Sequence, residues 1–130
     1  MNWVDKLLEV MEASAGNTIK VKVGDQTVEA IIKQELVDFV LRYKLILFRM
    51  GKQTFLDFLG FVQQGKNDEA FHLMLQSMTA EDIIAQMQMD TAELKEWNET
   101  REKFMDALKQ FVLYTLAPQA VKVLIGLLIV

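Results

Sequence analysis

Asp90–Phe111, with the sequence DTAELKEWNETREKFMDALKQF, decides the fold because it predicts one long helix. Its large apolar residues recur at helical spacings and lie on one face: Leu94, Trp97, Phe104, Leu108 and Phe111. Only Arg101 interrupts this row. Asp90, with Glu93 three residues later, has the spacing of a helix-capping pair. We therefore expect a helix over 91–116 that packs against other helices in a bundle.

The segment that follows this helix is the most apolar part of the chain. Pro118, the only proline, is expected to end the helix because it lacks an N–H donor. Residues 111–130 hold 15 apolar residues in 20, a length that can cross a bilayer. Lys122 and Pro118 disfavour insertion, so a membrane anchor is the less favoured alternative. We expect 119–130 to form a buried helix or strand that completes the core or an oligomer interface.

Toward the N-terminus, the spacing of apolar residues predicts further helices. They are expected at 4–14, 31–50, 54–63, 68–78 and 80–88. Three residues have the side chains and positions of N-caps: Thr54, Asn67 and Thr79. Gly51 and Gly65 follow two of the predicted helices, where glycine commonly ends a helix.

In residues 18–30 the apolar residues recur at every second position and not at the spacing of a helix. Ile19, Val21 and Val23 alternate with lysines, and Gly24-Asp25 follows, which predicts a β-hairpin. The second arm also fits the start of a helix near Thr27, so the first strand is the safer assignment. The chain is thus expected to be mainly α: a single domain, 1–130, forming a compact bundle of five to seven helices with one small β-hairpin.

Composition excludes several classes of protein. The chain has 130 residues, 52% of them hydrophobic, which supports a packed core and excludes disorder. It has no cysteine, so disulfides, zinc–thiolate sites and iron–sulfur clusters are excluded, and we expect a cytoplasmic protein. The net charge is −4, and residues 66–130 carry 10 acids against 6 bases. Nucleic acid is therefore an unfavoured partner.

The sequence offers little catalytic chemistry. Glu69 and His72 have the spacing of one half of a di-iron carboxylate site, but that site needs two such pairs and His72 is the only histidine. The acids Glu93, Glu96, Glu99 and Glu102 drift around the helix and are expected to face solvent. No phosphate-binding or nucleophile-elbow motif occurs. We expect no enzymatic activity, metal or cofactor.

Residues 79–97 are similar to the helix-turn-helix of many DNA-binding proteins, which makes a DNA-binding or regulatory protein one alternative. The resemblance covers 19 residues and departs from that motif at Ile84, where a small residue is usual, and at Gln88, where glycine is usual. Seven acids against three bases in 79–103 would repel the DNA backbone. The sequence favours a helical corner in a bundle instead.

Several predicted helices are apolar on more sides than one small domain can cover. This apolar surplus favours a non-enzymatic interaction or assembly module, which binds itself or another protein through apolar helices. The candidate interface residues are Leu45, Leu47, Phe48, Val121, Leu124, Ile125 and Leu128. Another alternative is a carrier of an apolar ligand, because aromatic and thioether side chains can line an adaptable pocket. The candidate pocket residues are Phe55, Phe58, Phe71, Met74, Met78 and Met87.

Overall fold

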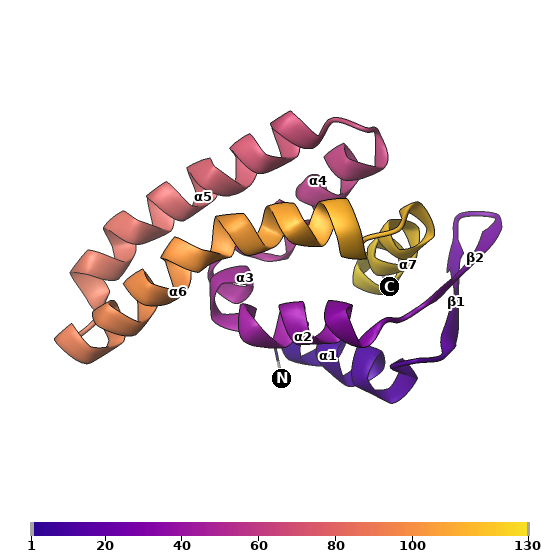
Figure 1. Cartoon of the computed structure of the whole chain (residues 1–130), viewed down its shortest axis with the longest axis horizontal. Helices are drawn as coiled ribbons and strands as arrows, with labels where there is room; N and C mark the ends of the chain where they lie inside the picture. Colours follow the sequence, from indigo (N-terminus) through magenta and orange to yellow (C-terminus); the bar gives the residue numbers. More distant parts are fainter. Residues whose placement is uncertain (1, 130) are drawn as a thin grey trace.

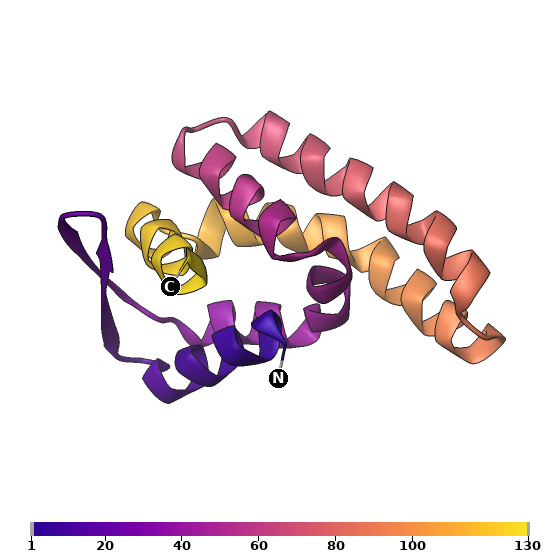
Figure 2. The same cartoon turned by 180° about the vertical axis from the view of Figure 1, so that it is seen from behind.

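The computed structural model describes residues 2–129 and has a mainly α-helical fold with one antiparallel hairpin (Figure 1). The elements are α1 (Trp3–Ser14), β1 (Thr18–Val23), β2 (Gln26–Ile31), α2 (Gln34–Arg42), α3 (Lys44–Met50), α4 (Lys52–Gln63), α5 (Asn67–Gln88), α6 (Thr91–Gln110), the π-helical turn η1 (Phe111–Thr115) and α7 (Pro118–Ile129). The predicted fold class is therefore confirmed. The hairpin and the turn between α5 and α6 lie at opposite ends of the molecule, as both views show (Figures 1 and 2).

The predicted hairpin is present, and its second arm is a strand and not a helix. β1 and β2 pair in antiparallel register from Thr18 opposite Ile31 to Val23 opposite Gln26. The two-residue loop begins with Gly24, whose φ of 63° lies in the left-handed region that favours glycine. Pairing along the full length of β1 decides the second arm, because it satisfies backbone groups that a helix starting at Thr27 would leave unpaired.

The prediction of a single helix over 31–50 is wrong. Ile31 belongs to β2, and α2 begins only at Gln34. The helical part divides into α2 and α3 at Tyr43, where φ is −108° and ψ is 21°. The ring of Tyr43 packs edge-on against Phe104 at 5.3 Å between centroids and against Phe39 at 5.2 Å. The break lets α2 contact η1 while α3 contacts α4 and α5. Tertiary packing has overridden a continuous helical pattern.

Residues 68–88 form one helix, not the two predicted with a break at Thr79. The Thr79 hydroxyl donates to the backbone oxygen of Leu75 at 3.0 Å, which is a bond within a continuing helix and not a cap. Asn67 and Thr54 also lie inside α5 and α4 and cap neither helix. The cap at Asp90 is correct, because its carboxylate accepts from the Glu93 backbone N–H at 2.9 Å.

The apolar C-terminal segment is a helix in the core. α7 begins at Pro118, which fits a first helical turn because that position needs no N–H donor. It packs against the hairpin, α1 and α4. Its buried residues are Ala120, Val121, Val123, Leu124, Gly126 and Leu128. The segment therefore completes the core of this chain.

Candidate functional site

Most of the predicted interface residues pack inside the chain. Leu47 on α3 is buried, and so are Val121, Leu124 and Leu128 on α7, whereas Ile125 is partly buried. The hairpin and α4 pack against α7, and α4 also packs against α3, so these elements cover apolar side chains that the sequence analysis assigned to an interface. Only Leu45 and Phe48, 45% and 46% exposed, remain at the surface. A partner surface must therefore be sought largely on other residues.

The predicted pocket residues do not surround an open space. Phe55, Phe58, Met74 and Met78 are buried in the core, and Phe71 is partly buried. Met87 is 82% exposed near the end of α5. These aromatic and thioether side chains fill the core with the exception of Met87, which lies at the surface.

The residues considered for metal binding and acid–base chemistry lie apart. Glu69 and His72 are exposed on α5, and the acids from Glu93 to Glu102 are exposed along α6. Within residues 2–129, no group of three or more histidine, aspartate or glutamate side chains is arranged to hold a metal ion.

A polar cluster joins three helices beneath the α5–α6 hairpin. The Arg49 guanidinium of α3 donates to Glu81 of α5 at 3.0 Å, and both side chains are more than four-fifths buried. Asp82 accepts from the Trp97 indole N–H at 2.8 Å and from Arg101 at 3.1 Å. The Arg49 guanidinium also lies 5.5 Å from the centre of the Trp97 ring. The cluster therefore neutralises both acids and fixes α5 against α6.

This pairing leaves the outer face of the later part of α5, from Leu75 to Gln88, without charge. Glu81 and Asp82 are the only charged residues between Met74 and Met89, and both take part in the cluster. The exposed residues spaced by four along α5 are Leu75, Thr79, Ile83 and Met87, which we name the α5 ridge. Leu75 is 50% exposed and Ile83 is 61% exposed. An exposed apolar row without charge is the kind of surface that protein partners cover.

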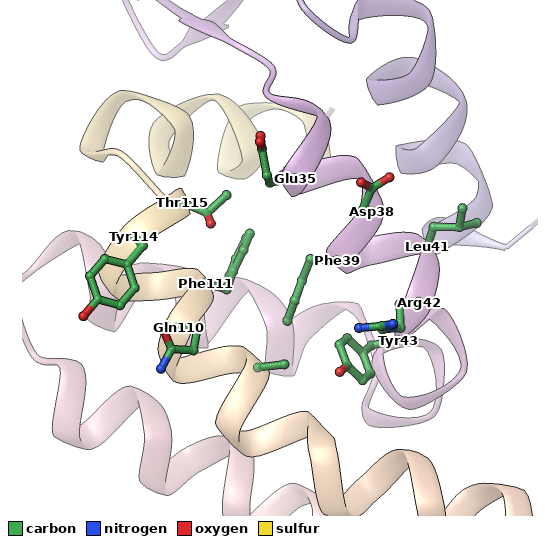
Figure 3. A pocket seen from close by; sticks show the side chains of 11 residues that line it. Glu35, Asp38, Phe39, Leu41, Arg42, Tyr43, Gln110, Phe111, Tyr114 and Thr115 are labelled. Carbon is green, nitrogen blue, oxygen red and sulfur yellow. The ribbon is translucent and has the colours of Figure 1, made fainter.

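A second surface feature is a groove of about 780 Å³ between α2 and the α6–η1 segment, which we name the α2–η1 groove (Figure 3). Its floor is the stacked pair Phe39 and Phe111, with ring centroids 4.1 Å apart and planes at 6°. Glu35 and Asp38 lie on the α2 side, and Tyr114 lies on the opposite side. The π-helical turn η1 supplies Phe111, Tyr114 and Thr115 to the groove, and such turns are frequent at functional sites.

Sequence reasoning missed this groove. The pattern of 91–116 predicts a continuous α-helix, and nothing in it indicates that the last turn widens to a π-helix at Phe111. The sequence did offer one signal of this groove, the pair Leu113-Tyr114. These two large side chains follow Phe111 and Val112 but lie outside the buried face of the predicted helix. They are 62% and 75% exposed.

No single helix within residues 2–129 has the length and apolar character needed to cross a membrane. The segments Thr91–Thr115 and Pro118–Ile129 reach the required length and apolar character only when they are counted together. The chain bends by 116° at the break between them.

Comparison with known proteins returns no match to a family model, to a curated protein or to a solved structure.

Proposed function

We propose that this chain is a non-enzymatic assembly module that binds a second copy of itself through the α5 ridge. The observation that supports the proposal most strongly is the combination of exposed apolar side chains and missing charge on one face of α5. Ile83 and Met87 are 61% and 82% exposed, and the two acids between Met74 and Met89, Glu81 and Asp82, are paired with arginines inside the chain.

Charge makes this face the most suitable place for two copies of the chain to meet. Each chain carries a net charge of −4, so two copies repel each other over most of their surfaces. The α5 ridge is a surface on which two copies can meet without placing like charges together. Its flanking residues Gln76, Ala80 and Ile84 are also uncharged.

The spacing of the ridge suits a symmetric helix pair. Leu75, Thr79, Ile83 and Met87 form a row of residues four apart, and rows of this kind interdigitate when two helices cross at about 50°. A two-fold axis would bring the same row of each copy together. The row covers thirteen residues, and its first and last members are about 18 Å apart along the helix.

The ridge also has a rigid support. Because the polar cluster ties α5 to α3 and α6, the second half of α5 is held in place before a partner arrives. A preformed surface loses less conformational entropy on binding. A stable interface buries about 800 Å² on each partner. A single pair of helices is small for this value, so we expect a dimer that dissociates on dilution.

The proposal is tested by replacing Ile83 with lysine and measuring molar mass by light scattering over a range of concentrations. The matched control is Ile31→Lys, because Ile31 is 58% exposed, nearly the same as Ile83, and lies outside the α5 ridge, at the end of β2. Ile83→Lys is expected to weaken dimerisation at least tenfold, since the burial of a charge in an apolar contact is costly.

Ile31→Lys is expected to dimerise as the original chain does. Equal weakening by both variants, or by neither, would show that the α5 ridge is not the dimer contact.

A further inference from the structure

We infer that the α2–η1 groove binds a basic amphipathic helix of a partner protein, with an apolar side chain on the aromatic floor and lysine or arginine beside Glu35 and Asp38. The groove receives no residue from α5, so this site is separate from the α5 ridge.

The floor of the groove supplies the apolar part of such a site. Phe39 and Phe111 stack across the space between the two walls, and Tyr43 packs beside Phe39 at 5.2 Å. Ala107 is small and keeps the floor open on the α6 side. A volume of about 780 Å³ is enough for two or three large side chains of a docked helix.

The edges of the groove carry apolar side chains that the chain leaves uncovered. Leu41 is 46% exposed on the α2 side, and Tyr114 is 75% exposed on the η1 side. Figure 3 shows the two residues on opposite sides of the groove, with the aromatic floor between them. An amphipathic helix laid along the groove would contact both edges and the floor together.

Charge determines which kind of helix fits. Glu35 and Asp38 are three residues apart on α2, so they lie on neighbouring turns of the same face, and both are exposed. Asp38 accepts from the Gln34 amide at 2.9 Å, which leaves its other oxygen for a partner. Arg42 is the one cation among the groove residues and lies one turn beyond Asp38.

This order gives the groove a direction. A partner helix with lysine or arginine near Glu35 and Asp38, and an acid or neutral residue near Arg42, complements it. The reverse orientation would place the lysine or arginine of the partner beside Arg42.

The test uses two synthetic amphipathic peptides of equal length, one of leucine and lysine and one of leucine and glutamate. Binding of each labelled peptide to the full chain is measured by fluorescence anisotropy. The leucine–lysine peptide is expected to bind saturably and at least tenfold more tightly than the leucine–glutamate peptide.

Three variants locate the binding site. The double variant Glu35→Gln/Asp38→Asn is expected to weaken binding of the leucine–lysine peptide about threefold to tenfold, because exposed ion pairs contribute modestly. The matched control Glu12→Gln/Asp57→Asn removes two exposed acids elsewhere and is expected to leave binding unchanged. Tyr114→Ser, which removes an exposed edge, is expected to weaken binding of this peptide without unfolding the chain.

The ridge variant Ile83→Lys separates the two surfaces, because it is expected to retain peptide binding whether or not the chain dimerises. Equal affinity for both peptides would overturn the inference. So would equal loss of binding in the Glu35/Asp38 variant and in its control, or loss of binding in Ile83→Lys.

Discussion

Replacing Trp97 with alanine is expected to lower the free energy of unfolding by about 3–5 kcal/mol, the usual cost of removing a large aromatic side chain from a core. Trp97 is 1% exposed, as its position in the predicted apolar row of 91–116 indicates. The substitution also removes an indole N–H that Asp82 accepts at 2.8 Å and a ring that the Arg49 guanidinium faces. Such a loss is a large fraction of the stability of a domain.

Trp97→Phe separates the two contributions. It retains most of the buried ring but leaves Asp82 without one donor, so we expect a smaller loss of about 1–3 kcal/mol. Urea unfolding followed by circular dichroism measures both variants. A Trp97→Ala variant as stable as the original chain would show that Trp97 is not a core residue and that the polar cluster does not hold α5 to α6.

Gly126→Ala is expected to destabilise the chain by about 1–3 kcal/mol, although alanine is the better helix former. A Cβ at Gly126 would lie 2.5 Å from a methyl carbon of Val21 and 2.9 Å from one of Val23. It would also lie 3.3 Å from the Val21 Cβ, which rotation of that side chain does not move, so a tight contact would remain. The hairpin would have to move away from α7.

Gly60→Ala is the matched control for this substitution. Gly60 lies within α4, and a Cβ there meets no atom within 4 Å. We expect Gly60→Ala to stabilise the chain by about 0.5–1 kcal/mol through helix propensity alone. The two glycine variants should therefore shift the midpoint of thermal unfolding in opposite directions. A shift of the same sign would mean that α7 and β1 are not in close contact.

Local patterns predicted the elements whose signals lie within a few residues. Asp90 caps α6, the β1 alternation forms the hairpin, and Val4, Leu7, Leu8 and Met11 bury one face of α1. These outcomes depend on hydrogen bonds and side-chain spacing that a short segment specifies.

The failures come from contacts between distant segments. Tyr43 breaks 31–50 because Phe104, sixty-one residues away in the sequence, packs against its ring. Thr79 has the side chain of an N-cap, but the acid that follows it, Asp82, bonds to Trp97 and Arg101 of α6. A capping residue does not begin a helix where tertiary contacts favour its continuation.

The surface features were only partly foreseen. Ile83, Ile84 and Met87 lie close together within the segment 79–97, but the similarity of this segment to a helix-turn-helix does not predict an exposed apolar surface. Arg49 pairs with Glu81 and Arg101 pairs with Asp82, and these pairs leave the apolar residues exposed on the other face of α5. Local patterns in the sequence do not connect either arginine to α5. The apolar surplus of α7, in contrast, is covered by the hairpin.

The most direct test of assembly through α5 uses the absence of cysteine from this chain. A single Thr79→Cys substitution places one thiol near the middle of the α5 ridge, and Glu12→Cys places one at an exposed position on α1 as the control. Both are treated with a short bismaleimide at tens of micromolar protein and analysed by denaturing electrophoresis. Efficient covalent dimer formation by Thr79→Cys but not by Glu12→Cys is the predicted result. Equal and low yields from the two variants would contradict the proposal that two copies meet at the α5 ridge.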